Sequence, residues 1–449
     1  MNKREVMSRL RKSGVEYVRV LWCDNAGIIR AKAINSSVLT EGDNFDYPVG
    51  ISLAQQAVPV MYDGVSPGSG LGPVGEVFLK PDWDTLTVLN YNQSFASVAA
   101  DMYKNGSPWK CCPRDFLKRA IDELDKFGFE INAAFENEFY LLRQPEGRDV
   151  PVPVDDTLFA MASAMDSCPA VIDEITKSLK NQSMPVERYY PESGPGQYEI
   201  SIRYSNALRA ADNQLNYRQT VNGVALKHGM IASFMPKIFA DAAGSGCHMH
   251  LSLLKHSKNI SADIENDNML SDTMAYFMAG VLRHLHALCA ITVPSVNSYR
   301  RLKPHCWSGA YSCYGYDNRE AAVRVIKTHD GESVSHIELK TVDASSNPYL
   351  ALGSVIYAGI DGISNKLSLN DPVDVDPGTI PLNRQKSEGI RRLPETLGEA
   401  LEELKNDRTL KDALGENLYK AYYAVKENEW KTMKDYGIEE ERKTLLKKF

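Results

Sequence analysis

The sequence predicts an α+β fold in which a small β-rich N-terminal domain precedes a larger domain whose helices pack on a mostly antiparallel sheet. The chain has 449 residues, too many for one ordinary hydrophobic core. Short strand-like segments and turns dominate residues 1–105, whereas short strands alternate with longer segments of helical periodicity beyond them. We therefore expect one domain at 1–105 and a second at 106–449.

The N-terminal domain is predicted from strand and turn signals. Tyr17–Trp22 has the aromatic and β-branched composition of a strand, and Asp24–Gly27 is a turn sequence that leads into a second strand at 28–34. The glycine-rich span 64–75 is expected to be a loop.

The larger domain is predicted from helical periodicity. Apolar residues recur at helical spacing from Arg114 until Gly128 ends the pattern. Further helices are expected at 207–228, 271–290 and 348–366, and a set of charged, leucine-rich surface helices from 394 onward. Strand-like segments lie between these helices, as a sheet covered by helices requires.

Composition limits the classes of partner. Lys and Arg number 51 against 58 Asp and Glu, so the formal net charge of −7 offers no general attraction for nucleic acid or for an anionic membrane. The most apolar stretch, 274–296, is interrupted by Arg283, His284 and His286, and we expect no membrane-spanning helix and no secretory signal. The eight scattered cysteines are typical of reduced thiols in a cytoplasmic protein.

Polar residues at alternate positions are the most informative feature of the sequence. Glu136 and Glu138 are two residues apart, so in a strand both carboxylates point to one face while Phe135 and Phe139 point to the other. Similar alternation occurs in or beside three other strand-like segments, which contain Glu192 and Glu199, His248 and His250, and Glu338 and Lys340. We expect these side chains to line one face of a sheet.

A bound cation is the natural partner of so many acids. One polar pair of this kind is usually the solvated face of an amphipathic strand, but like charges side by side repel, and a desolvated carboxylate is costly unless it is compensated. Oxygen-rich ligation with one or two imidazoles and no thiolate favours Mg²⁺ or Mn²⁺ over zinc. The number of acids suggests two or more ions.

Arginines supply the complementary charge. The four of interest are Arg300, Arg301, Arg319 and Arg324, whose guanidinium groups are suited to phosphate and carboxylate oxygens. Each arginine taken alone is more often a surface ion-pair residue, and the chain has neither a Walker A loop nor a G-x-G-x-x-G motif. Together, divalent ions and arginines indicate a phosphoryl-transfer site.

Six sequence blocks carry a resemblance to a known family. They are FENEF at 135–139, ESGPGQYE at 192–199, GSGCHMHLSL at 244–253, NSYRRLKP at 297–304, NREAAVRV at 318–325 and IELKTVDASSNPYLAL at 337–352. In this order they resemble the glutamine synthetases throughout the larger domain. The N-terminal sequence, together with HCWSGAY at 305–311, is similar to the glutamine-synthetase-like domains of fungal sporulation proteins and plant nodulin fusions, and to the γ-glutamylamide synthetases.

The resemblance implies a fold and an assembly. Residues 1–105 would form a β-grasp domain, and residues 106–449 a glutamine synthetase and guanido kinase-like catalytic domain, whose curved antiparallel sheet binds ATP and metal. The β-grasp domain of a neighbouring subunit would close each active site. The protein would therefore be a homo-oligomer, either a hexameric ring or a dodecamer.

The resemblance also implies roles for individual residues. It assigns one metal site to Glu138, Glu192 and Glu199, and a second to Glu136, His248 and Glu338. It places the nucleotide against His250, Ser252, Arg319, Arg324 and Glu187. Glutamate would contact Gly244, Arg301 and Lys340, and catalytic positions are occupied by Arg301, Arg319 and Trp307.

Five positions differ from the ammonia-using members of the family. Trp307 replaces a flap glutamate that takes a proton from ammonium, and Phe159 aligns with a tyrosine of the ammonium pocket. Asp46 corresponds only in part to an aspartate of that pocket, so we assign it no role. Lys340 replaces an arginine and Ala243 an asparagine at the glutamate site, which leaves the identity of the carboxylate substrate open.

These features favour an ATP-dependent ligase that forms a γ-glutamyl amide from glutamate and an organic amine through γ-glutamyl phosphate, in cytoplasmic nitrogen metabolism. An ammonia-dependent glutamine synthetase is the first alternative, and a catalytically weak, ring-forming scaffold is the second. A zinc hydrolase is disfavoured because the chain has neither H-E-x-x-H nor a Cys/His zinc spacing.

Overall fold

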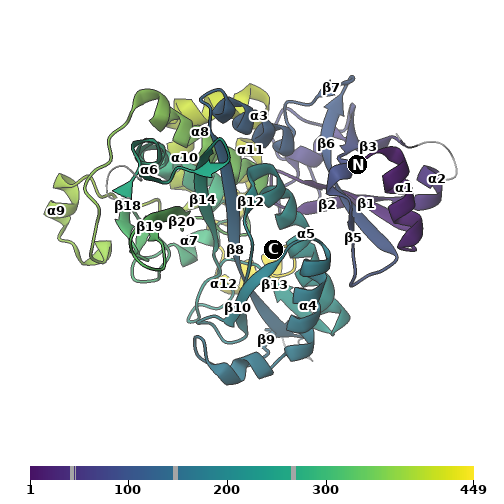
Figure 1. Cartoon of the computed structure of the whole chain (residues 1–449), viewed down its shortest axis with the longest axis horizontal. Coiled ribbons are helices and arrows are strands. Elements are labelled where there is room, and N and C mark those ends of the chain that lie inside the picture. Colours follow the sequence, from purple (N-terminus) through teal and green to yellow (C-terminus); the bar gives the residue numbers. More distant parts are fainter. Residues whose placement is uncertain (41–44, 46, 145–149, 264–268) are drawn as a thin grey trace.

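The computed structural model describes the chain except for residues 41–44, 46, 145–149 and 264–268. Asp46 therefore lies outside the described residues. Figure 1 shows the N-terminal sheet at one end of the molecule, in purple, and the larger sheet with its long helices beside it.

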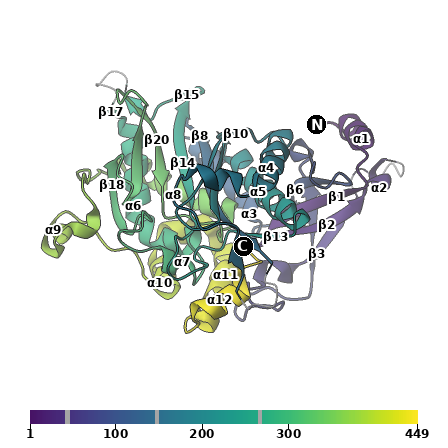
Figure 2. The ribbon, with the colours of Figure 1, turned by 90° about the horizontal axis from the view of Figure 1, so that it is seen from below.

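The N-terminal region forms a mixed sheet. Its main strands follow the order β2 (Ile29–Asn35), β1 (Tyr17–Cys23), β6 (Phe95–Lys104), β4 (Glu76–Pro81) and β3 (Val49–Ser52), and the short strands β5 (Thr87–Val88) and β7 (Ser107–Pro108) pair with β6. β1 and β6 run parallel, and the other pairs are antiparallel. Helices α1 (Lys3–Lys12) and α2 (Ser36–Thr40) lie together at its outer end (Figure 2). Short 3₁₀ turns, η1 (Leu53–Ala57) and η2 (Trp83–Thr85), connect its strands.

The larger sheet is almost entirely antiparallel. Its strands follow the order β10 (Val186–Pro191), β11 (Gln197–Ile202), β8 (Glu130–Arg143), β14 (Cys247–Lys255), β20 (Val334–Leu339), β19 (Ala321–Lys327) and β18 (Tyr311–Tyr316). The pair β18 and β19 alone is parallel among the described residues. Shorter strands extend it, namely β9 (Val152–Pro153), β12 (Ser205–Asn206), β13 (Met230–Ser233) and β15 (Lys258–Asn259), while β16 (Ala262–Asp263) and β17 (Met269–Leu270) form a separate pair.

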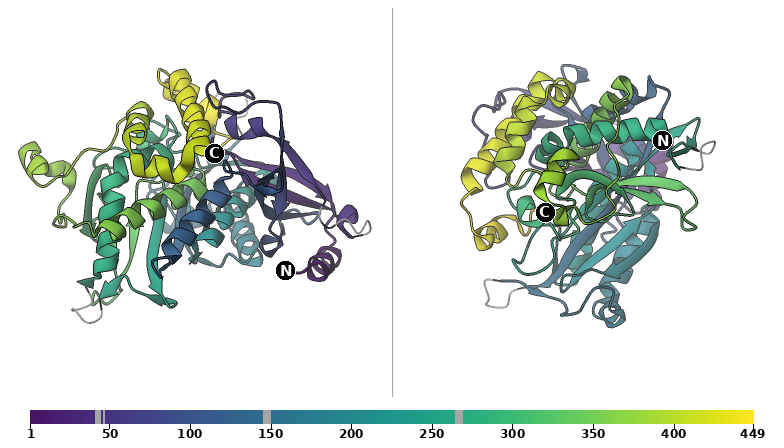
Figure 3. Two further views of the ribbon diagram at one scale, coloured as in Figure 1. Left: turned by 90° about the horizontal axis from the view of Figure 1, so that it is seen from above. Right: turned by 90° about the vertical axis from the view of Figure 1, so that its left-hand side faces the viewer.

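Long helices cover the apolar side of this sheet. The central helix α8 (Pro348–Asn365) packs against α3 (Pro113–Asp125), α6 (Asp272–Thr292) and α11 (Arg408–Met433), and α10 (Leu397–Asn406) packs against α6 (Figure 3). Helix α5 (Ala207–Lys227) contacts β8 and β13, and α4 (Pro169–Asn181) lies beside α5. The remaining helical segments are η3 (Ala162–Asp166), α7 (Ser298–Arg301), η4 (Pro377–Thr379), α9 (Leu382–Ser387) and α12 (Ile438–Leu445).

The α+β prediction is confirmed, and so are its main elements. The strand predicted at Tyr17–Trp22 is β1, and the helices predicted at 207–228, 271–290 and 348–366 are α5, α6 and α8. The helices after residue 394 are present but are not only surface helices, because Lys426 and Glu429 of α11 are buried. The chain changes from one sheet to the other between β7 and β8, which is compatible with the boundary near residue 105 that we retain as a proposal.

The most apolar helix belongs to the protein core. Among the described residues, α6 is the one helix long and apolar enough to cross a membrane, but 78% of its apolar window is buried inside the protein. A helix buried in this way is typical of a large hydrophobic core.

The first and last parts of the chain are tied together. The Val60 N–H donates to Glu429 Oε1 at 2.8 Å, and the Val60 carbonyl accepts from Lys448 Nζ at 2.5 Å. Glu429 also pairs with Lys426 Nζ at 2.9 Å, and both side chains are only 1% exposed. Helix α11 and the residues that follow α12 thus hold a loop of the N-terminal region in place.

Candidate active site

Acids and imidazoles lie opposite one another on neighbouring strands. Glu199 of β11 is paired with Glu138 of β8, and Glu136 of β8 is paired with His248 of β14. Residues directly opposite in an antiparallel ladder point to the same face of the sheet. Pairing therefore brings residues from distant parts of the sequence onto one surface.

The same surface continues toward the other edge of the sheet. His250 of β14 is paired with Glu338 of β20, which in turn is paired with Arg324 of β19. On the opposite face, Phe135 and Phe139 are buried in the hydrophobic core. The alternation predicted for the segment that forms β8 is confirmed: its polar side chains lie on one face, and its phenylalanines pack in the core on the other.

Three carboxylates at one end of this surface have only weak compensation. We call Glu138, Glu192 and Glu199 the Glu199 group. Among the described residues no lysine or arginine pairs with them, and a His248 nitrogen lies 3.8 Å from Glu138. Their hydrogen bonds come from neutral donors: the Gly246 N–H to Glu138 (2.9 Å), the Ser193 N–H to Glu192 (3.0 Å) and the Ser201 hydroxyl to Glu199 (2.9 Å).

The electrostatics of the Glu199 group call for a cation. Burial, followed by the charges of Glu136 and Glu138, raises the pKa of Glu199 to about 8. Burial and the charge of Glu138 raise the pKa of Glu192 to about 7. A carboxylate that resists ionisation beside like charges is stabilised when a divalent ion enters, so these three oxygen donors fit a hard cation such as Mg²⁺ or Mn²⁺.

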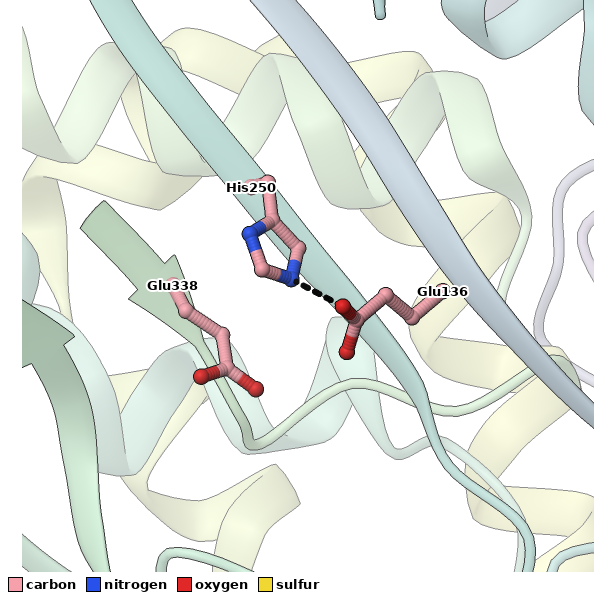
Figure 4. Close-up of side chains that lie close together, drawn as sticks. All are labelled: Glu136, His250 and Glu338. Atoms are coloured by element: carbon pink, nitrogen blue, oxygen red, sulfur yellow. Dashed lines mark ion pairs between the residues drawn. The ribbon is translucent and has the colours of Figure 1, made fainter. Parts of the chain in front are cut away.

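A second set of ligands lies further along the same face. Glu136, His248, His250 and Glu338 form what we call the Glu338 group. The His248 Nδ1 lies 3.1 Å from Glu338 Oε1 and 3.5 Å from Glu136 Oε2, and the His250 Nε2 lies 3.1 Å from Glu136 Oε1. Figure 4 shows Glu136, His250 and Glu338 converging, and one ligand atom from each lies within 4.8 Å of the others.

The Glu338 group is already compensated by cations of the protein. Glu338 accepts from Lys340 Nζ at 3.0 Å and from Arg324 Nη1 at 3.1 Å. Burial opposes ionisation of Glu338, but the charge of Lys340 and the hydrogen bond of His248 outweigh it and hold its pKa well below the ordinary value. Burial likewise opposes ionisation of Glu136, yet hydrogen bonds from His248 and His250 keep its pKa low.

Both imidazoles are placed to serve an ion in the Glu338 group. The resemblance assigned His248 to this site and His250 to the nucleotide. The structure brings His250 to the same carboxylates, so the donor set contains two carboxylates and two imidazoles. Mixed oxygen and nitrogen ligands of this kind suit Mn²⁺ and related ions, and also admit Mg²⁺.

The residues expected at the nucleotide are distributed unevenly. Ser252 follows His250 on the same face of β14, and the Arg324 Nε has no hydrogen-bond partner among the described residues. Arg319 is exposed in the turn between β18 and β19 and makes no ion pair with the part of the chain that the structure describes. Glu187 on β10 pairs with the exposed Arg203 at 3.0 Å and is not brought to the other residues.

The residues expected at glutamate lie close together. Arg301 is 6% exposed, and its Nη2 lies 3.1 Å from His248 Nε2 and 3.2 Å from the Lys340 carbonyl. Its Nη1 has no partner among the described residues and is free to bind an anion. Gly244 is required here because a Cβ would lie 2.7 Å from Arg301 Cγ. Lys340 forms an ion pair with Glu338. Its ammonium group therefore differs from a free guanidinium group, which would bind a substrate carboxylate through two N–H donors.

Trp307 and Phe159, which the resemblance aligns with polar groups near the nucleophile, are both exposed aromatic side chains. Trp307 is 56% exposed and sits in a loop where its own φ is +53° and that of Gly309 is +70°. Phe159 is 51% exposed and packs edge-on against Tyr190, with ring centroids 5.9 Å apart. Neither side chain can accept a proton.

Sequence reasoning missed three residues that the structure brings to the site. His336 Nε2 lies 2.8 Å from His250 Nδ1, Arg188 Nη2 lies 3.2 Å from Glu136 Oε1, and Glu320 accepts from the Trp307 N–H at 2.7 Å. His336 precedes Glu338 by two residues, so strand alternation alone could have placed it on this face. Arg188 depends on a pairing irregularity in β10 that no sequence pattern signals.

Known proteins resemble this chain along nearly its whole length. The family described as glutamine synthetase, catalytic domain, matches residues 110–444. Type-1 glutamine synthetase 1 of Dictyostelium discoideum is 33% identical over 99% of this chain and 91% of its own, and glutamine synthetase of Methanocaldococcus jannaschii is 33% identical over 96% and 95%. The solved structure of a GmaS/ADP complex has a TM-score of 0.84 and 27% identity over 98% of both chains. A structure described as a novel glutamine synthase homolog has a TM-score of 0.84 and 29% identity over 96% of this chain and 97% of its own.

Proposed function

Because the chain belongs to the glutamine synthetase family of ATP-dependent, amide-forming ligases, we propose that it joins the γ-carboxylate of glutamate to an organic amine. The product would be a γ-glutamyl amide. The observation that carries this proposal is the exposed Trp307 in the loop where the ammonia-using members have a proton-accepting glutamate.

An apolar surface favours a nucleophile with a carbon skeleton. Ammonium is small and strongly hydrated, so a pocket that selects it needs polar groups to replace its water. Trp307 and Phe159 offer aromatic surface, and Leu158 and Met161 next to Phe159 are 74% and 46% exposed. A substrate amine with an apolar substituent would bury such surface and gain binding energy from it. The similarity to GmaS, a γ-glutamylmethylamide synthetase, supports an amine in this role.

The polar residues would bind and orient the other two substrates. Divalent ions, Mg²⁺ or Mn²⁺, held by the Glu199 and Glu338 groups would supply charge neutralisation for the phosphates. Arg324 and Arg319 would bind phosphate oxygens, and Arg301 would bind a carboxylate of glutamate. A γ-carboxylate oxygen of glutamate would attack the terminal phosphorus of ATP, ADP would leave, and the amine would displace phosphate from the resulting γ-glutamyl phosphate.

A phosphate-release assay tests the proposal. The purified protein is incubated with ATP, Mn²⁺ or Mg²⁺, glutamate and a panel of primary amines, and the γ-glutamyl product is identified by mass. We expect turnover with at least one alkylamine to exceed turnover with ammonium by tenfold or more in kcat/KM. Faster turnover with ammonium than with every amine would overturn the proposal.

Ammonia-dependent glutamine synthesis is the second candidate. The names of the curated relatives favour it, since those aligned over almost the whole chain are called glutamine synthetases. The same assay separates the two functions, because glutamine forms from ammonium at low concentration only in this second case. A chain that binds Mn²⁺ and ATP but releases no phosphate with any nucleophile would instead be the ring-forming scaffold.

The assembly and location are also proposals. We propose a cytoplasmic homo-oligomer, a hexameric ring or a dodecamer, in which the N-terminal domain of one subunit closes the site of the next. Exposed apolar side chains of the N-terminal region, Tyr62, Val74 and Phe78, are 46%, 86% and 43% exposed and would be covered in such a ring. Light scattering of the purified protein would give the number of subunits.

A further inference from the structure

We propose that Glu320 is the base that takes a proton from the amine nucleophile, in place of the acid missing at Trp307. The inference rests on the proposed function and names one catalytic residue for its second half-reaction. Nothing in the resemblance assigns Glu320 a role.

Contacts with the loop that contains Trp307 and Gly309 place Glu320 near the ligand face. In β19, Arg324 is paired with Glu338, and the Ala322 carbonyl accepts the Lys340 N–H at 2.9 Å. Glu320 lies in the turn just before β19, and the loop that its carboxylate holds packs on Ala322 and Lys340, since a Cβ at Gly309 would lie 2.8 Å from Ala322 Cα and 3.1 Å from Lys340 Cβ. The carboxylate therefore lies at the start of β19, next in sequence to Arg319 and four residues before Arg324.

The contacts of Glu320 hold it beside the loop at 305–309, which contains Trp307 and which we call the aromatic loop. Its Oε1 accepts the Trp307 N–H at 2.7 Å, and its backbone N–H donates to Asn318 Oδ1 at 3.0 Å. Among the described residues its Oε2 accepts no hydrogen bond and no lysine or arginine forms an ion pair with it. One carboxylate oxygen is thus fixed by the loop while the other is free to accept a proton.

The surroundings of Glu320 suit a base. It is half-buried, and the charged groups near it are Lys340 at the end of β20, His305 of the aromatic loop and Asp376 of the segment beside that loop. Burial raises its pKa above the ordinary value, although the Trp307 N–H opposes the shift. A carboxylate with a raised pKa holds a proton more readily than an ordinary one. The other acids of this face belong to the Glu199 and Glu338 groups and would be occupied by ions.

Proton transfer to Glu320 accompanies formation of the amide bond. An alkylammonium ion gives one N–H proton to Glu320, and the freed lone pair attacks the carbonyl carbon of γ-glutamyl phosphate. The C–N bond forms as the bond from that carbon to the phosphate oxygen breaks. The second N–H proton leaves with the phosphate, which departs as hydrogen phosphate, and Glu320 then releases its proton to water.

Two nucleophiles separate this role from a structural one. An alkylammonium ion has a pKa of about 10, like a lysine side chain, and needs a base at pH 8, whereas hydroxylamine is largely unprotonated at that pH. Glu320→Gln keeps an oxygen acceptor for the Trp307 N–H but removes the base. The exposed Glu332→Gln, in the turn between β19 and β20, is the matched control.

We expect Glu320→Gln to lower kcat/KM for the preferred alkylamine about a hundredfold and to change that for hydroxylamine by less than threefold, whereas Glu332→Gln changes neither. An equal loss with both nucleophiles, or no loss with either, would overturn the role of Glu320. If the wild-type protein released no phosphate with glutamate and either nucleophile, the proposed function itself would fail. Glu320→Ala provides a further check, since a merely structural role predicts that it slows both nucleophiles equally.

Discussion

The Glu199 group and the Glu338 group share one face of one sheet, yet their buried carboxylates differ in the charged partners that surround them. In the Glu338 group, Lys340 and Arg324 lie 3.0 and 3.1 Å from Glu338, and the carboxylates stay ionised without any ion. In the Glu199 group no lysine or arginine among the described residues forms an ion pair, and the pKa values of Glu192 and Glu199 rise.

The difference teaches which carboxylates are kept ionised by lysine and arginine of the protein and which are not. The Glu338 group is a network that breaks when one partner is removed, because the remaining charges are left buried and unpaired. In the Glu199 group burial and the neighbouring carboxylates oppose ionisation, so replacing one carboxylate should relieve that cost. The two groups should therefore respond to the same kind of substitution with opposite signs.

The largest effect is expected from the Glu338 group. Glu338→Gln removes the charge that faces Lys340 and Arg324, and should destabilise the metal-free protein by about 3–5 kcal/mol while reducing ligation at least about a hundredfold. Urea unfolding in the presence of a chelator measures the first change and phosphate release the second. An unchanged unfolding midpoint would show that the network does not stabilise the fold.

The Glu199 group should give the opposite change in stability. The native pKa of Glu199, about 8, lies above the value of about 4.3 expected in the unfolded chain, so ionisation costs native stability as pH rises between these values. Glu199→Gln should abolish ligation but stabilise the metal-free protein by about 1–3 kcal/mol at pH 8–9. The gain should vanish near pH 4. Destabilisation at pH 8.5 would contradict the proposed repulsion.

The number of protons released on metal binding should also reflect the raised pKa values of the Glu199 group. An ion entering the Glu199 group would displace protons from Glu192 and Glu199, so Mn²⁺ affinity should fall more than about tenfold per pH unit as pH drops from 8 to 6, and approach about a hundredfold per unit where both carboxyls are protonated. Calorimetry in buffers of different ionisation enthalpy gives the number of protons released per ion. Glu199→Gln should lower that number by about one, and an unchanged number would show that Glu199 does not titrate.

The smallest effect concerns the orientation of one imidazole in the Glu338 group. The His336 Nε2 lies 2.8 Å from His250 Nδ1, which turns the His250 Nε2 toward Glu136. His336→Ala should weaken Mn²⁺ binding about tenfold with little change in stability. Paramagnetic resonance of free Mn²⁺ measures the affinity, and the exposed His329→Ala is the control. Equal affinity in both variants would remove His336 from the site.

The polar face of each strand could be predicted from sequence, but the neighbours across the sheet could not. The spacing of Glu136 and Glu138 against Phe135 and Phe139 gives the face because side chains alternate along a strand. The order of strands is different from their order in the sequence, so the pairing of His250 with Glu338 or of Arg324 with Glu338 has no local signal. The resemblance supplied the residue types without these pairings.

Residues whose role depends on a contact rather than on a motif escaped prediction. Glu320 lies within the block NREAAVRV, yet only the fold of the loop shows that the backbone of Trp307 bonds to its carboxylate. Lys340 was predicted at the substrate, which stays a prediction, and its ion pair with Glu338 at 3.0 Å was not foreseen. In both cases a side chain is positioned by a segment far away in sequence, and sequence spacing carries no information on such contacts.

The hydrogen bonds of Val60 to Glu429 and Lys448 can form only after the last part of the chain has been synthesised. The loop around Val60 emerges early from the ribosome, but its partners are translated almost four hundred codons later. Until then the backbone groups of Val60 have only water or transient neighbours. The N-terminal sheet can assemble during translation, whereas its final attachment to the rest of the subunit must wait for the last helices.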